Sequence, residues 1–99
     1  MTDGLSHEAA MRAHARRRFE ERCGFTLEPG EYDRMVGCIR RDNLPPFALT
    51  KENLRFYKVR VRGTEAYALW KRGTIVTFYP SIEWVLRVGG RVLAREGAV

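Results

Sequence analysis

One short stretch of the chain, HARRRFEER, carries a histidine and four arginines between positions 14 and 22. Nearby cations favour the neutral, basic form of an imidazole, whereas a guanidinium keeps its charge at any physiological pH. Core packing requires neither group, so His14 is a candidate for proton transfer and the arginines are candidates for holding an anion. The alternative is a solvated helix face on which Arg18 and Arg22 pair with Glu21 and other acids.

The surrounding segment, SHEAAMRAHARRRFEERCG, predicts a helix of about four to five turns, with Ser6 as its cap and Gly24 at its end. At about 100° per residue, one broad apolar face is formed by Leu5, Met11, Ala15, Phe19 and Cys23. The border of that face carries His7, His14 and Arg18. We expect Arg16 and Arg17 to face water and Arg18 to lie beside His14.

A second helix is predicted over EPGEYDRMVGCIRR, where Pro29 suits the first turn. Its apolar positions repeat at i, i+3, i+4 and i+7, and they are Tyr32, Met35, Val36 and Ile39. The next segment, DNLPPFALTKEN, contains two adjacent prolines and predicts an extended loop.

Three strands are predicted after the loop: LRFYKVRVR, EAYALWK and TIVTFYP. The first alternates apolar residues with Lys58, Arg60 and Arg62, which indicates one buried face and one basic, exposed face. Gly63-Thr64 and Arg72-Gly73 predict hairpin turns, so the strands form an antiparallel meander. The third strand has no charge, which favours a central position, and PSIEWVLRVGG predicts a short helix capped by Ser81.

These elements predict an α+β fold: two N-terminal helices packed on a small antiparallel meander of three to four strands, with a short C-terminal helix. The chain has 99 residues, which fit one domain with loose ends at 1–5 and 90–99. No apolar run approaches the ~20 residues of a membrane span, and the N-terminus lacks a secretory pattern, so we expect a cytoplasmic protein. Cys23 and Cys38 do not form a CxxC pair and only two histidines are present, so we expect neither a metal nor a cofactor.

The net charge of +6 is concentrated in one part of the chain, since residues 54–99 hold nine basic and three acidic residues. A localised positive excess favours binding of a polyanion, because neutralising phosphates releases counterions. The candidate nucleic-acid contacts are Arg18, Arg55, Lys58, Lys71 and Arg72. The alternative is that these side chains keep an exposed sheet soluble and protect its edges.

The order of HARRRFEERCGF, EPGEYDRMVGCI and three strands ending in GTIVTFYP resembles the barnase/EndoU/colicin/RelE-like superfamily of small ribonucleases, particularly versions from phage and prophage. The resemblance covers positions 14 to 80. It implies cleavage of RNA without a metal, by attack of the ribose 2′-hydroxyl on the adjacent phosphate.

The resemblance also implies roles for individual residues. His14 would be the acid or base, Arg60 or Arg62 would hold the phosphate, and Thr77 would donate a hydrogen bond to it. Tyr79 shares the face of Thr77 by parity, so it would stack on a base or donate a proton. Two features depart from the family: the first strand offers three basic candidates where the family uses one, and EAYALWK lacks a further polar catalytic group.

We therefore carry three hypotheses. The first is a metal-independent endoribonuclease of toxin or phage type, with RNA as its partner and an antitoxin as its regulator. The second is an inactive protein of the same fold that binds a host machine such as RNA polymerase, the ribosome or a defence nuclease. The third is a nucleic-acid-binding regulator without catalysis. The sequence leaves the RNA substrate and the oligomeric state open.

Overall fold

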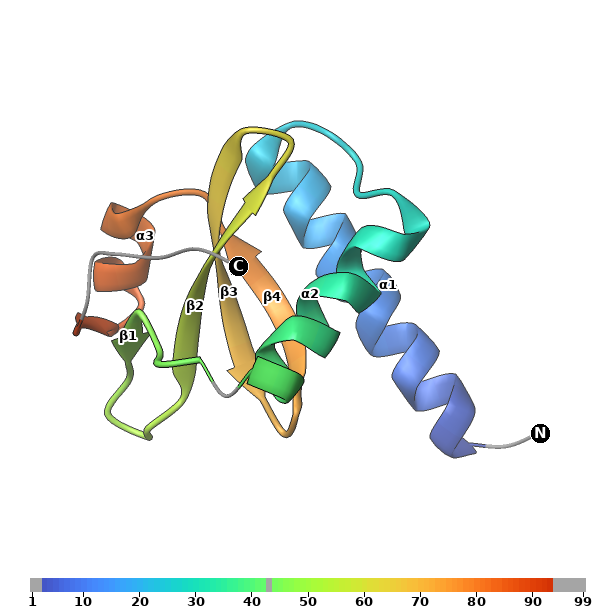
Figure 1. Ribbon diagram of the computed structural model, residues 1–99, viewed down its shortest axis with the longest axis horizontal. Coiled ribbons are helices and arrows are strands. Elements are labelled where there is room, and N and C mark those ends of the chain that lie inside the picture. Colours follow the sequence, from blue (N-terminus) through green and yellow to red (C-terminus); the bar gives the residue numbers. More distant parts are fainter. Residues whose placement is uncertain (1–2, 43, 94–99) are drawn as a thin grey trace.

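The computed structural model describes residues 3–42 and 44–93 and confirms the α+β class (Figure 1). Two helices come first, followed by four strands, a short helix and a last strand. In chain order, the elements are α1 (Asp3–Cys23), α2 (Pro29–Asp42), β1 (Ala48–Leu49), β2 (Arg55–Val61), β3 (Thr64–Lys71), β4 (Thr74–Tyr79), α3 (Ile82–Arg87) and β5 (Arg91–Val92).

The two long helices begin and end where local chemistry requires. α1 begins at Asp3, three residues before the expected cap Ser6, and ends at Cys23. The next residue, Gly24, has a positive φ of 91°, and its N–H donates to the Glu20 carbonyl. α2 has Pro29 in its first turn, and the Glu31 carboxylate accepts the Glu28 N–H at 2.6 Å in a capping-box contact.

The strands form a five-stranded antiparallel sheet in the order β4-β3-β2-β1-β5. Two-residue turns join β2 to β3 and β3 to β4, and both have positive φ at both positions, as type I′ hairpins require. The second turn is Arg72-Gly73 as predicted. The first is Arg62-Gly63, one residue earlier than expected, so Arg62 belongs to the turn rather than to the strand.

The prediction of a central position for the uncharged strand TIVTFYP was wrong, because β4 is at the edge of the sheet. α1 packs chiefly against β4, so helix α1 rather than another strand shields its apolar side chains. β4 also contains a bulge: Leu69 pairs with Thr77 and Trp70 with Ile75, which leaves Val76 as the extra residue. The bulge lets both Ile75 and Phe78 point into the core.

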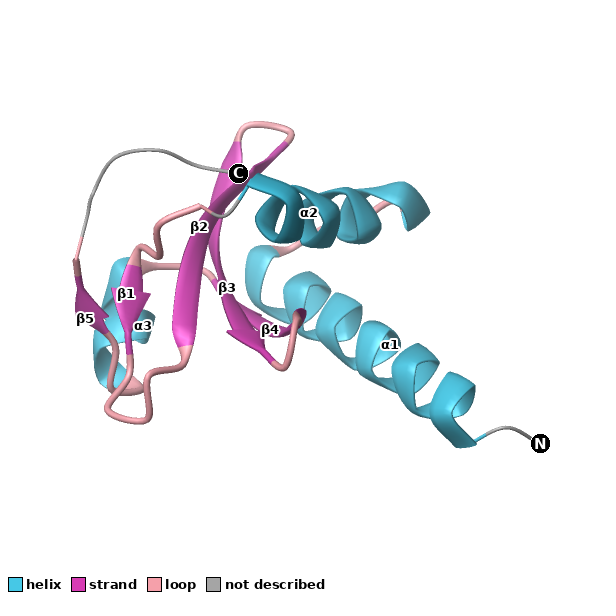
Figure 2. Ribbon diagram, turned by 60° about the horizontal axis from the view of Figure 1, so that its bottom comes forward, coloured by secondary structure: helices cyan, strands magenta, loops and turns pink. Residues whose placement is uncertain are grey.

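The sheet separates two apolar layers (Figure 2). α1 and α2 cover one face, where the four predicted core residues of α2 are buried with Phe19 of α1 and Val59 of β2. α3 covers the other face, where Val85 packs with Phe56 and Tyr67. The face opposite α1 and α2, expected to be exposed and basic, is therefore apolar where α3 covers it.

Tyr32 links α2 to β4 across the larger core. Its hydroxyl donates to the Ile75 carbonyl at 2.6 Å and accepts from the Thr74 hydroxyl at 2.9 Å. Burial raises the pKa of the Tyr32 phenol, because the charged phenolate would be desolvated. This neutral hydrogen-bonded group fixes α2 against the start of β4.

Parts of both ends of the chain belong to secondary-structure elements. Residues 3–5 belong to α1, and β5 pairs with β1 beside a buried Gly90, while residues 1–2 and 94–99 lie outside the described part. The segment DNLPPFALTKEN contains β1, and neither β1 nor β5 was predicted because two residues carry no periodicity.

Candidate functional site

His14 lies in the middle of α1 with an exposed side chain. It forms no hydrogen bond or ion pair with the described part of the chain. The adjacent Ala15 is buried against the sheet, whereas His14 itself is exposed. Arg18 follows one turn later and forms an ion pair with Glu21 at 3.2 Å, which matches the alternative of a solvated face.

Thr77 and Tyr79 do share one face of β4, as the parity argument predicted, and this is the face opposite α1 and α2. The group beside them is Arg22, not His14, Arg60 or Arg62. Its Nη1 donates to Thr77 Oγ1 at 3.2 Å and to the Phe78 carbonyl at 3.0 Å. The side chain thus passes around the edge of β4 and links the two faces of the sheet.

Two aromatic rings complete the surroundings of Arg22. Its Cζ lies 4.7 Å from the centre of the Tyr79 ring and 5.0 Å from that of Trp84. The two rings are 5.8 Å apart, and Arg87 lies over Trp84 at 5.7 Å. From the sequence, one interpretation was that Arg22 pairs with Glu21 and other acids on a solvated helix face, whereas in the structure it contacts β4 and Trp84. At about 100° per residue, Arg22 lies about 80° around α1 from His14, so the helical pattern alone did not group the two residues.

Arg60 projects from β2 onto the same face as Thr77 and Tyr79, but a carboxylate holds it. Arg60 lies opposite Glu65 in the β2–β3 pairing, and its Nη2 is 2.7 Å from Glu65 Oε2. Lys58 is 3.8 Å from the same oxygen and has a largely buried side chain. The hydrogen bond from Arg60, followed by the charges of both cations, lowers the pKa of the Glu65 carboxyl.

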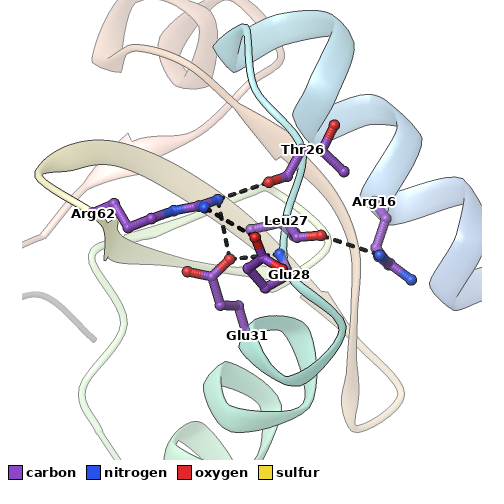
Figure 3. Close-up of polar contacts among 6 residues, drawn as sticks. All are labelled: Arg16, Thr26, Leu27, Glu28, Glu31 and Arg62. Carbon is purple, nitrogen blue, oxygen red and sulfur yellow. Dashed lines mark hydrogen bonds and ion pairs between the residues drawn. The ribbon is translucent and has the colours of Figure 1, made fainter.

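Arg62 points to the α1–α2 connection instead of to β4 (Figure 3). Its Nη2 donates to the Thr26 carbonyl at 2.7 Å and lies 3.1 Å from Glu31 Oε1, while its Nη1 is 3.5 Å from Glu28 Oε1. Its guanidinium also lies 4.8 Å from the centre of the Phe25 ring. These contacts fix the turn between β2 and β3 to the start of α2.

Arg16 supports the same connection from the other side, because its Nη2 donates to the Leu27 carbonyl at 3.1 Å (Figure 3). The prediction that Arg16 faces water was wrong: its side chain is half-buried, and its Nε is a buried donor without a hydrogen-bond partner. Arg17 is exposed as expected.

Three predicted nucleic-acid contacts come together at one end of the sheet. Arg55 begins β2, Lys71 ends β3, and Arg72 is in the β3–β4 turn. The C-terminal end of α2 adds Arg40, whose Nε donates to the Gly73 carbonyl at 2.8 Å, and its neighbour Arg41 (Figure 1). We call this group the basic end: Arg40, Arg41, Arg55, Lys71 and Arg72.

The basic end is poorly neutralised. All five side chains are exposed, and only Arg41 forms an ion pair with a carboxylate of the described residues, Asp42 at 3.4 Å. Trp70, half-buried, pairs with Arg55 across the strands and packs edge-on against Tyr57. The two remaining predicted contacts, Arg18 and Lys58, belong to α1 and to the middle of β2 and are not part of this group.

Over residues 3–42 and 44–93, no cluster of three histidine, cysteine or acidic side chains is arranged to hold a metal. Cys23 and Cys38 are free thiols, and burial raises the pKa of Cys23 against the smaller opposing effect of Arg22. None of the described helices has the length and apolar character needed to cross a membrane. Comparison with protein-family models, with curated proteins and with solved structures finds no match to this chain.

Proposed function

We propose that the protein binds nucleic acid through the basic end, with RNA as the form that the family resemblance implies. The observation that carries the proposal is the gathering of five exposed cations from α2, β2, β3 and the β3–β4 turn, of which only Arg41 has a carboxylate partner among the described residues. Neutralising phosphates with such cations releases counterions, which gives affinity without sequence preference. The half-exposed Trp70 adds an aromatic surface for stacking of a base.

Salt dependence tests this proposal. Binding of a single-stranded RNA is measured by fluorescence anisotropy at several salt concentrations, and the slope of log affinity against log salt counts the phosphates neutralised, at about 0.7 for each on a single strand. Replacing Arg55, Lys71 and Arg72 with glutamine is expected to lower the slope by about 2. DNA of the same sequence shows whether the 2′-hydroxyl contributes to affinity.

A matched control removes the same charge elsewhere. Arg17, Arg34 and Arg91 are exposed and have no ion pair within the described residues. Their combined replacement with glutamine is expected to leave most of the slope intact, since long-range attraction alone is screened within about 10 Å at 0.1 M salt. Equal losses in the two triple variants would mean that net charge, and not the basic end, governs binding.

Cleavage of RNA is a second proposal, and the contact between Arg22 and Thr77 favours it. A guanidinium beside a hydroxyl can stabilise the charge that develops on a phosphorane. Tyr79, on the same face of β4 as Thr77, would supply the proton-transfer group, because His14, which the resemblance implies for this role, does not lie beside Thr77. The test incubates RNA with the protein in EDTA and analyses the products for cyclic-phosphate ends. Tyr79→Phe and Thr77→Val should each abolish such products, whereas the control His7→Ala on α1 should not. Intact RNA at several pH values excludes the proposal.

A further inference from the structure

The guanidinium of Arg22 is held on one edge and open on the other. Both hydrogen bonds to β4 come from Nη1, which uses the two N–H groups of that atom. Within residues 3–42 and 44–93, no group accepts a hydrogen bond from Nε or Nη2. Neither atom is a buried donor lacking a partner, so both reach solvent. Nε and Nη2 form the edge of a guanidinium that binds two oxygens of a phosphate at once.

The open edge of Arg22 is also fixed in position and keeps its full positive charge. The rings of Tyr79 and Trp84 hold the plane of the guanidinium, and the side chain forms no ion pair with a described carboxylate. Arg87 Cζ also lies 5.7 Å from the centre of the Trp84 ring, and the Thr77 hydroxyl, which accepts from Arg22, keeps its own hydrogen to donate. The open edge of Arg22 thus lies near a second guanidinium that contacts the same indole, and the Thr77 hydroxyl holds the Arg22 guanidinium from its opposite edge.

This place is within reach of the basic end along one face of the sheet. Lys71 projects to the same face as Leu69, which pairs with Thr77. Thr74 pairs with Lys71, and from Thr74 to Thr77 the strand rises about 10 Å. A strand of nucleic acid bound at the basic end would therefore need only a few more nucleotides to reach Arg22.

We infer that Nε and Nη2 of Arg22 form a phosphate-binding site, with Arg87 as a nearby second cation and with Thr77 positioning the guanidinium through Nη1. The site takes a backbone phosphate of the nucleic acid whose next segment lies on the basic end. The inference rests on the proposed function for the identity of the ligand, but the site itself requires only a phosphate group. It gives Arg22 the phosphate contact that the sequence assigned to Arg60 or Arg62.

NMR of the wild-type protein tests the site directly, because the Nε–H signal of Arg22 reports on its free edge. Inorganic phosphate is titrated first, followed by uridine oligonucleotides of about four and about twelve residues, which bracket the site size of small single-strand binders. We expect inorganic phosphate and the longer RNA to shift the Arg22 signal, and the shorter RNA to shift mainly the signals of the basic end. An Arg22 signal that stays constant with both phosphate and the longer RNA overturns the inference.

Two substitutions add a readout of affinity. Arg22→Gln removes the charge and should lower the salt slope for the longer RNA by about 0.7, with no change for the shorter one. Arg22→Lys keeps a charge but loses the planar edge, and it should weaken binding of the longer RNA about three- to tenfold. Arg17→Lys is the matched control on the exposed side of α1, and circular dichroism confirms that each variant is folded.

The outcomes separate this inference from the proposed function. If the basic-end signals respond to RNA and Arg22 does not, the proposed function stands and the inference is wrong. If Arg22 responds to inorganic phosphate and RNA shifts no signal, the site exists and the RNA proposal is wrong. The phosphate-induced shift of the Arg22 Nε–H signal is also compared between the wild type and the variants Thr77→Val and Arg87→Gln. If the shift is equally strong in all three proteins, the phosphate is an adventitious ion only, and the site as described is overturned.

Discussion

Replacing Arg62 with alanine distinguishes a structural role from the phosphate-binding role that the sequence predicted. In the structure, Arg62 bonds to the Thr26 carbonyl, pairs with Glu28 and Glu31 and lies over Phe25. All of these partners belong to the α1–α2 connection or to the start of α2. We therefore expect the Arg62→Ala variant to be less stable and to bind RNA as the wild type does.

The magnitude follows from the individual contacts. Each exposed ion pair contributes about 0.2 to 1 kcal/mol, and both are screened because the Arg62 side chain is 45% exposed. The hydrogen bond to the Thr26 carbonyl contributes about 1 kcal/mol, and the contact with Phe25 about 0.5 kcal/mol. Their loss lowers the free energy of unfolding by about 2 kcal/mol, or the Tm by roughly 10 °C for a chain of this size.

Urea unfolding followed by circular dichroism measures this loss, and a double-mutant cycle with Glu31→Gln isolates the closest ion pair. The expected coupling between Arg62 and Glu31 is about 0.5 to 1 kcal/mol. Arg60→Ala is the matched control: it removes one exposed ion pair with Glu65 and should cost less than about 1 kcal/mol.

The opposite pattern would refute the structural role. If Arg62→Ala unfolds at the same urea concentration as the wild type while RNA affinity or cleavage falls by tenfold or more, then Arg62 serves the nucleic acid. The contacts with the start of α2 would in that case contribute nothing measurable to stability.

Three further predictions concern the sheet and its supports. By NMR, the pKa of the Glu65 carboxyl should be below its ordinary value in the wild type and should return toward that value in Arg60→Gln. The contact therefore stabilises the fold at pH values above the ordinary pKa, and this stabilisation is lost as the pH falls through the lowered pKa. Tyr32→Phe should lower the free energy of unfolding by about 1 to 2 kcal/mol, because a buried carbonyl of β4 loses its donor. Gly90→Ala should lower the free energy of unfolding by about 2 kcal/mol or more, because an added Cβ would be 2.8 Å from a backbone oxygen. Gly37→Ala is the contrast: this residue is inside α2 and an added Cβ would meet no atom within 4 Å, so the change should stabilise the fold by about 0.5 to 1 kcal/mol. Thermal unfolding measures both effects.

The parts of the fold that could be predicted are those in which local periodicity and burial agree. α2 was predicted with its four buried residues because i, i+3, i+4, i+7 spacing is a strong signal in a short helix. The longer strands were predicted from their own apolar segments, and one of the two hairpin turns from a short connection that contains glycine. β1 and β5 are too short to show a period, and the edge position of β4 depends on where α1 packs, which a single strand's composition does not encode.

The candidate site was harder to predict, because long side chains choose partners that are distant in the sequence. Thr77 and Tyr79 were placed on one face correctly, since parity fixes the direction of each side chain. Arg22 reaches a carbonyl 56 residues later in the chain, and Arg62 reaches one 36 residues earlier. Such contacts follow from the packing of α1 and α2 on the sheet, so residue type and spacing alone do not give them.

The arginines of this chain show why segment charge does not locate a binding surface. The positive excess is in residues 54–99, but the fold neutralises Arg60 with Glu65 and Arg62 with acids of α2. It also brings Arg40 to the β3–β4 turn, from a segment whose own charge is slightly negative. A cation that already has a carboxylate partner must lose that contact before it can bind a phosphate, and this loss cancels much of the gain. Among the described residues, Arg22 and all members of the basic end except Arg41 have no carboxylate partner, and these are therefore cations from which the fold can build a binding surface.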